Sequence, residues 1–243
     1  MLIFFKRIRK KLLSENRITA YSRYAIGEII LVVVGILIAL QINNWNENRK
    51  AQKKLHNIYA LIVEDLKNDI ADIDQLIQEQ NRRKVILDKI LNDEISKEEY
   101  ESCTECRFVL IGFPNLSIDQ RGYNLLQSHA DNNKINSESL QIAISQFYSK
   151  HLYDISADDG VRQASLQNNI FYWEQHTNWF ADYITDRDYS GFIEYATISQ
   201  DYKNRVAMYR LLHFDIFDTV LFSFKQEANK IIERIEQELA RNE

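Results

Sequence analysis

The sequence predicts an all-α protein in which one N-terminal transmembrane helix continues into an exported, antiparallel helical bundle. The 243 residues include one proline and six glycines, too few for the turns of a β-rich fold of this length. Aromatic residues make up 12% of the chain and recur at helical spacing after residue 46, which supplies a core. An uncharged apolar segment near the N-terminus is long enough to cross a bilayer.

The apolar segment sets the domain boundaries. Residues 29–46 carry no charge, and from Ala25 the apolar stretch has the length of about 20 residues that a membrane-spanning helix needs. A cleaved signal peptide is disfavoured because the leader is long and Gln41 stands where a small residue is required. A buried helix of a soluble protein is disfavoured because the segment is apolar all round. We therefore expect a cytoplasmic basic amphipathic tail (1–23), a transmembrane helix (24–44) and an exported helical bundle domain (45–243).

Charge predicts the orientation of the span. Seven basic side chains precede it, whereas Arg49, Lys50, Lys53 and Lys54 follow it. Lys and Arg accumulate on the cytoplasmic side of membrane proteins, so the N-terminus is expected in the cytoplasm and the domain after about residue 46 is expected to be exported. The tail is expected either to lie on anionic membrane lipid or to serve only as a positive flank.

The exported domain is predicted to be acidic. Residues 1–46 carry seven basic and two acidic side chains, so the remainder has a net charge of −10 against −5 for the whole chain. A surface of this sign disfavours nucleic acid as a partner.

One face of the span combines a carboxylate with small residues. Tyr21, Glu28, Gly35 and Ala39 fall within about 40° of one line on a helix. Small residues let transmembrane backbones approach closely, and a carboxylate at this depth gains from a protein partner. We expect a transmembrane interface, either with a second copy or with another membrane protein. The alternative is that Glu28 reaches the lipid headgroups and Gly35 has no special role.

The same region resembles a known group of proteins. The runs 24–29 (YAIGEI), 35–40 (GILIAL) and 42–47 (INNWNE) resemble an uncharacterised Bacteroidota family of single-pass membrane proteins. A weaker similarity covers 113–150. The resemblance implies the single-pass topology and adds no chemistry, because the family has no assigned activity.

Apolar spacing predicts the remaining elements. The transmembrane helix is expected to run on to about Leu91, and 96–101 and 119–128 to form short helices. Residues 107–118 are the only strand-like run, with a loop around Pro114 as the alternative. Asn136 is a candidate cap for a helix that carries Leu140 and His151 on one face. The last two helices are expected at 158–183 and 200–241; the inward stripe of the second is Val206, Tyr209, His213, Ile216, Val220, Phe224, Ala228, Ile231, Ile235 and Leu239.

Cys103 and Cys106 form a C-x-x-C motif without the βαβ surroundings of a redox protein or the further ligands of a zinc site. In an oxidising compartment a local disulfide is the preferred interpretation, two free thiols come next, and catalysis is least favoured.

Other chemical motifs are weak. The five histidines lack ligand spacing, and His213 is interpreted as a core residue. Asp154, Asp158 and Asp159 are interpreted as caps and turn residues before Gly160, in preference to a cation site. The aromatic residues of 172–183 are interpreted as core, in preference to a ligand cleft: Tyr172, Trp173, Trp179 and Tyr183.

These observations favour a non-enzymatic, membrane-anchored interaction or scaffold protein without a cofactor or metal, acting as a homo-oligomer or as an accessory subunit of a membrane complex. A periplasmic ligand-sensing domain that signals through a partner is the second hypothesis, and an enzyme is the third. The sequence names no ligand.

Overall fold

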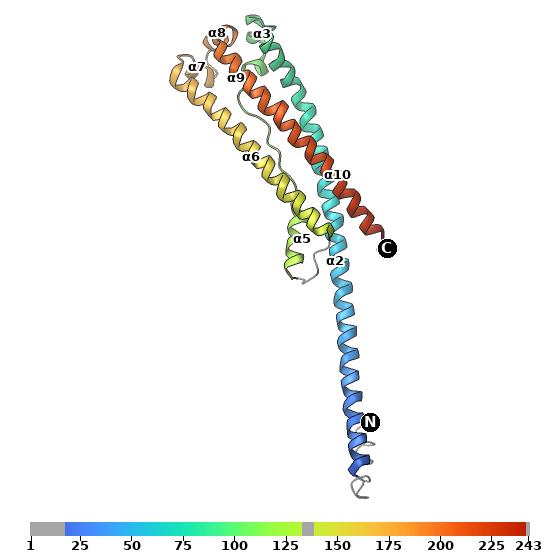
Figure 1. The fold of residues 1–243 in the computed structure, drawn as a ribbon. Coiled ribbons are helices and arrows are strands. Elements are labelled where there is room, and N and C mark those ends of the chain that lie inside the picture. The colour runs from blue at the N-terminus through green and yellow to red at the C-terminus, as the bar shows by residue number, and fades with distance from the viewer. Residues whose placement is uncertain (1–17, 133–138, 242–243) are drawn as a thin grey trace. The chain divides into compact units, whose positions relative to one another are not determined.

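The computed structural model describes residues 18–132 and 139–241, and all regular structure in these ranges is helical (Figure 1). The predicted all-α class is therefore confirmed. Residues 1–17 of the predicted basic tail and Asn136 lie outside the described residues, whereas 18–23 form the start of α2. In chain order the helices are α2 (Ile18–Leu91), α3 (Lys97–Ser102), α4 (Thr104–Arg107), α5 (Arg121–Asn132), α6 (Ser139–His176), α7 (Phe180–Ile184), α8 (Ser190–Ile198), α9 (Gln200–Arg210), the π-helix η1 (Leu211–Ile216) and α10 (Phe217–Arg241).

The chain divides into two compact units, Met1–His56 and Asn57–Glu243, and the boundary falls within α2. In the second unit, α2, α6 and the α9–η1–α10 helix are the long elements, and ion pairs fix the directions of two of them. Residue numbers rise along α2 as they fall along the α9–η1–α10 helix, so the two run in opposite directions. The pairs are Lys67–Glu236, Asp74–Lys225 and Asp88–Arg210.

An aromatic core fills the end of the second unit where α3, α7 and α8 gather (Figure 1). Trp173 and Tyr183 are fully buried, and the Tyr183 ring stacks on Phe192 at 4.5 Å between centroids. Their burial supports the core interpretation of this aromatic run, whereas Tyr172 is 37% exposed. Contacts among such rings stabilise a core beyond their buried area.

The segment between α4 and α5 contains no strand, so the loop was the correct alternative. Gly112 has a φ of 80°, which a strand does not allow. Its carbonyl oxygen accepts hydrogen bonds from Arg83 Nη1 at 2.7 Å and from the Tyr209 hydroxyl at 3.0 Å. The loop is thereby held against α2 and α9.

Helix α6 corrects two predicted boundaries. It runs through Gly160 without a break and ends at His176, whereas the sequence predicted a turn before Gly160 and a helix to residue 183. The turn interpretation of Asp158 and Asp159 was wrong, because both carboxylates pair with Arg162 of the same helix. A carboxylate three or four residues before an arginine favours helix rather than turn.

The last helix has the predicted bounds and most of its predicted inward face, since Phe224, Ala228, Ile231 and Ile235 are buried as expected. The π-helix η1 carries about one extra residue per turn, and only the two buried positions directly after it move on by one. Phe217 and Leu221 are fully buried, whereas the predicted Ile216 is 43% exposed and Val220 is only half-buried.

Helix α5 starts at Arg121, two residues after the predicted start, and packs closely on α2 at Gly122. A Cβ at Gly122 would lie 2.6 Å from Ile62 Cγ1 and 2.8 Å from the Ile62 backbone nitrogen. Glycine is therefore required here by the close approach of the two helices. Gly160 is different, because a Cβ at that position would have no neighbour within 4 Å.

We expect Gly122→Ala to destabilise the protein by about 1–3 kcal/mol, since the added methyl overpacks against backbone that cannot move freely. Gly160→Ala is the matched control and should raise stability by up to about 1 kcal/mol, because alanine is the better residue within a helix. Urea unfolding of the full chain in mild detergent measures both. Equal stability of the two variants would contradict the close-packing account.

Candidate functional site

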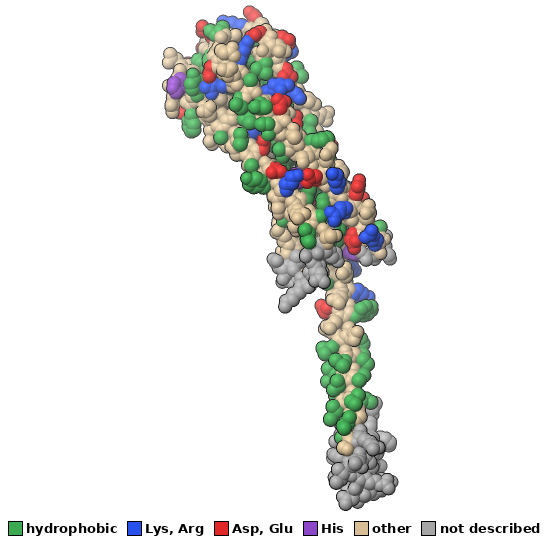
Figure 2. Space-filling model, in the orientation of Figure 1, with side chains coloured by type: hydrophobic (Ala, Val, Ile, Leu, Met, Phe, Trp, Pro, Cys, Tyr) green, Lys and Arg blue, Asp and Glu red, His purple; other side chains and the backbone are tan. Residues whose placement is uncertain are grey.

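The first unit presents an apolar helical segment whose side chains are not covered by the described part of the chain. From Ala25 on, α2 contains an 18-residue window of mean hydropathy 2.6 in which no residue is buried. Leu31 is 72% exposed and Leu37 57% exposed. Figure 2 shows hydrophobic side chains along the visible side of this segment. A helix of this length and composition can span a membrane.

The predicted interface residues all lie on this helix, within the first unit. Because α2 is unbroken from Ile18, the helical spacing that aligns Tyr21, Glu28, Gly35 and Ala39 holds. A Cβ at Gly35 would have nothing within 4 Å, and Ala39 is exposed. Among the described residues, therefore, no packing contact requires a glycine at position 35.

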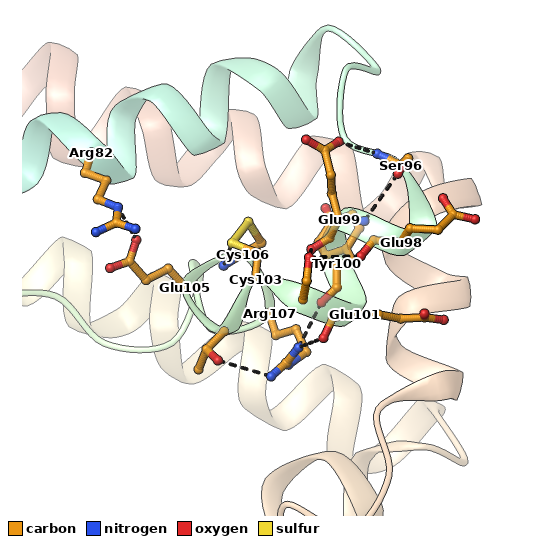
Figure 3. Close-up of a disulfide and its surroundings, with 12 residues drawn as sticks. Arg82, Ser96, Glu98, Glu99, Tyr100, Glu101, Cys103, Glu105, Cys106 and Arg107 are labelled. Carbon is orange, nitrogen blue, oxygen red and sulfur yellow. Dashed lines mark hydrogen bonds and ion pairs between the residues drawn. A yellow bond between two sulfur atoms is a disulfide. The ribbon is translucent and has the colours of Figure 1, made fainter.

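The two cysteines lie between α3 and α4. Cys103 and Cys106 are joined in a disulfide, which was the preferred interpretation of the motif (Figure 3). Cys103 ends α3 and precedes α4, and its Sγ accepts a hydrogen bond from the Cys106 backbone N–H at 3.1 Å. Ser96 caps α3 by accepting from the Glu99 N–H, and the Glu99 carboxylate accepts from the Ser96 N–H.

Arg107, directly after the disulfide, connects this corner to the core. Its Nη1 donates to the carbonyl oxygens of Tyr100 at 2.9 Å and Glu101 at 2.7 Å (Figure 3). Its own carbonyl oxygen accepts from the buried Tyr183 hydroxyl at 2.8 Å. End groups of both short helices are thus satisfied by named partners. The surroundings of the disulfide are those of a structural brace.

Two carboxylates on α2 accept hydrogen bonds from the start of α5 and the residues just before it. Asp65 is fully buried and accepts from Arg121 Nε at 3.0 Å, from Arg121 Nη2 at 2.6 Å and from the Gly122 N–H at 2.8 Å. Asp69, one turn later, accepts from the Asp119 N–H at 2.9 Å. Apolar periodicity did not reveal this pair. The available signal was two aspartates four residues apart beside the inward positions of α2.

Asp69 is the more unusual of the two acids. It is 1% exposed, and its Oδ2 has no hydrogen-bond partner within the described structure. Burial raises its pKa to about 7, against the lowering effect of the Asp119 N–H. A carboxyl group that is protonated near neutral pH avoids the cost of an unpaired buried charge.

A second buried polar cluster lies where α6 meets η1 and the start of α10. Arg162 is fully buried, donates to Asp158 at 2.7 Å and places its guanidinium 3.6 Å from the Phe217 ring and 4.5 Å from Phe113. Arginine is rarely buried unless it is paired in this way. Its Nη1 has no partner among the described residues.

His213 belongs to the same cluster. It is 1% exposed and stacks on Tyr209 with 3.8 Å between ring centroids. Burial, helped by the positive charges of Arg162 and Arg83, lowers its pKa to about 3, so the ring is neutral. His213 lies in the core, as the sequence predicted. The hydrogen-bonding capacity of its ring is not fully used, because Nδ1 has no hydrogen-bond partner in the described structure.

Neither cluster has the donor set of a metal centre. Across 18–132 and 139–241, no group of three or more His, Cys, Asp or Glu side chains could hold a metal ion. A ligand-sized hollow of about 590 Å³ lies in the second unit, beside α7 and α8. Its walls combine aromatic, acidic and small residues: Asn178, Trp179, Asp182, Asp188, Ser190, Gly191, Glu194, Tyr195, Ile198 and Ser199.

Comparison with protein families identifies residues 28–171 as matching a family of unknown function, DUF6090. This match covers more than half of the 243 residues. The chain belongs to the DUF6090 family. The DUF6090 region starts within the apolar segment of α2 and ends within α6, so it includes the disulfide, the carboxylate pair and Arg162. No curated protein and no solved structure matches the chain.

We expect Asp69→Asn to raise stability at pH 8 and to have little effect near pH 4. Because the folded-state pKa is raised, the protonated acid stabilises the fold at low pH, and this contribution is lost as pH rises toward about 7. The stability gap between variant and parent should widen by roughly 1.4 kcal/mol per pH unit across that window.

Asp65→Asn is the matched control, since it keeps the acceptor for Gly122 but loses the ion pair with Arg121. It should lower stability at pH 8. Urea unfolding of the full chain at pH 4 to 8 gives both curves, and a pH-independent effect of Asp69→Asn would show that Asp69 is charged throughout.

Proposed function

We propose that the chain is a single-pass protein of a bacterial inner membrane, in the Bacteroidota, with a cytoplasmic N-terminus and a periplasmic, antiparallel helical bundle after about residue 46. It acts as a non-enzymatic interaction or scaffold protein, either as a homo-oligomer or as an accessory subunit of a membrane complex. This function needs neither a cofactor nor a catalytic residue.

The exposed apolar segment of α2 carries this proposal. An uncovered apolar surface of this length costs roughly 25 cal/mol per Å² in water, so it requires lipid or another protein. The second unit supports the non-enzymatic part through the roles of its chemically notable groups. Asp65, Asp69 and Arg162 each contact neighbouring elements, and the two cysteines brace a corner.

Association through the span is the mechanistic part of the proposal. Glu28, Gly35 and Ala39 would form the contact face, with Tyr21 at its cytoplasmic end. Gly35 and Ala39 permit close backbone approach, and Glu28 would accept a hydrogen bond from the partner. Interhelical hydrogen bonds of this kind contribute roughly 0.5–2 kcal/mol each.

A ligand-sensing domain is the second candidate, and the hollow beside α7 and α8 favours it. Trp179 and Tyr195 line it together with three carboxylates, of which Asp182 is paired with Arg187 at 3.0 Å. Aromatic walls with carboxylates suit an organic cation. Calorimetric titration with small amines distinguishes the two candidates, because a scaffold role requires no binding there.

The orientation predicts the behaviour of reporter fusions. Alkaline phosphatase joined after Glu243 should be active, since it folds only after export, and a fluorescent protein at the same position should be dark. The opposite pair of results would reverse the topology. Fusion after Arg23, before the span, is the matched control and should give the opposite pattern to fusion after Glu243.

The interface predicts a position-dependent loss of association. Gly35→Ile should weaken crosslinking between copies by about tenfold or more, because a branched side chain keeps the backbones apart. Membrane insertion should not suffer, since isoleucine is more apolar. Gly27→Ile is the matched control: Gly27 also has open space around it but lies away from this face. Unchanged association in Gly35→Ile, read by crosslinking in native membranes, would contradict the interface. A mild-detergent pull-down identifies any other subunit.

A further inference from the structure

The π-helix η1 interrupts an otherwise continuous helix at the level of the buried arginine. The backbone keeps helical dihedral angles on both sides, with φ −58° and ψ −46° at Arg210 and φ −64° and ψ −42° at Phe217. The segment is therefore one residue too long for a regular α-helix, and the helix continues past it. π-Segments of a single turn occur frequently at functional positions.

The sequence around η1 is apolar on two adjacent faces. In the present arrangement Phe217 and Leu221 are fully buried, and the residues before them, Ile216 and Val220, lie nearer to solvent. In a regular α-helix continued from His213, Ile216 and Val220 lie about 60° and about 20° to one side of the His213 direction, and Phe217 and Leu221 lie about 40° and about 80° to the other. Taken as pairs, Ile216 and Val220 are therefore better aligned with His213. Both pairs are large and apolar, so neither arrangement would place a charged side chain in the core.

Contacts at both ends fix the flanking helices. Arg210 pairs with Asp88 at 2.5 Å, and Lys225 pairs with Asp74. Further along α10, Glu227 accepts from Lys150 at 2.6 Å. A change of packing between residues 211 and 224 can therefore occur without moving α9 or the C-terminal part of α10, provided that the extra residue stays between them.

One contact stabilises the present arrangement, and two polar atoms destabilise it. The stabilising contact is that of Phe217 with the Arg162 guanidinium at 3.6 Å. The destabilising atoms are His213 Nδ1 and Arg162 Nη1, which are buried without a hydrogen-bond partner among the described residues. Burial also raises the pKa of Asp218, which is half-buried beside this segment.

We propose that η1 is a two-position element: the extra residue moves from 211–216 to about 217–222, and Ile216 and Val220 replace Phe217 and Leu221 in the core. The intervening turns rotate by about 100° about the helix axis, which is the angle of one residue. Phe217 then leaves Arg162, and Asp218 turns toward solvent. The flanking helices keep their ion pairs, so this is a local switch between two packed states rather than unfolding.

Two single-residue deletions separate the positions. Deletion of Asp215, which lies within η1 and is exposed, removes the extra residue and leaves Phe217 and Leu221 inward on a regular helix. Deletion of Phe222, which is 61% exposed, shortens the helix by one residue after Leu221. The helix then becomes regular only with Ile216 and Val220 turned inward. The first deletion locks the present position and the second locks the other.

The reporter is Leu221→Cys in the full-length chain, labelled with a maleimide without reductant so that the native disulfide stays closed. Leu221 is buried in the present position and exposed in the other. Deletion of Asp215 should slow labelling by about tenfold or more relative to the Leu221→Cys parent, because it abolishes the excursions. Deletion of Phe222 should make labelling as fast as at the exposed Gln226→Cys.

Ile235→Cys is the control, because Ile235 is buried beyond the turns that move. Its labelling rate should be the same in the full-length chain and in the Asp215 deletion. Three results would overturn the proposal. The first is an unchanged labelling rate at Leu221→Cys after deletion of Asp215. The second is an equal fall of the labelling rate at Ile235→Cys, which indicates general stabilisation, and the third is slow labelling of Leu221→Cys in a folded Phe222 deletion.

Discussion

The packing of the second unit depends on one buried positive charge. Arg162 has no exposed surface, and its guanidinium touches elements from three parts of the chain: Asp158 on its own helix, Phe113 on the loop and Phe217 on α10. Desolvating a guanidinium is costly, so a carboxylate and aromatic faces must compensate it wherever it is buried. That requirement makes the central packing specific, because an arrangement that withdrew both aromatic rings would leave the guanidinium with only the carboxylates of its own helix.

The loop between α4 and α5 is the second consequence of this centre. Phe113 reaches Arg162 directly after Gly112, whose left-handed backbone offers its carbonyl oxygen to Arg83 and Tyr209. At the start of the same segment, the disulfide and the hydrogen bonds of Arg107 to α3 hold the chain in place, and near its end the Asp119 N–H donates to Asp69. A segment without regular structure is thus ordered by polar contacts at both ends, as buried backbone requires.

Sequence patterns predicted the elements that depend on local spacing. The helical class, the extent of α2 and the bounds of the last helix follow from apolar periodicity and from scarce glycine and proline. The patterns failed where a tertiary contact decides. Asp158 and Asp159 are an exception, because their partner Arg162 lies three and four residues later on the same helix, and this spacing was available in the sequence. The shift from Ile216 to Phe217 could not be predicted, because residues 211–224 are apolar on both candidate faces. The role of Asp65 and Asp69 depends on the start of α5, fifty or more residues away.

The buried carboxylates of α2 have a further consequence during synthesis. A chain emerges N-terminus first, so the inward face of α2 is made long before α6 and α10 can cover it. Asp65 and Asp69 interrupt that face with two carboxyl groups, which water can hydrate while the helix is uncovered. The first partner to arrive is the start of α5, where Arg121 and the Gly122 N–H neutralise Asp65. The inward face of the uncovered helix is therefore less apolar than an unbroken row of aliphatic side chains would be, and such a face has a lower tendency to associate.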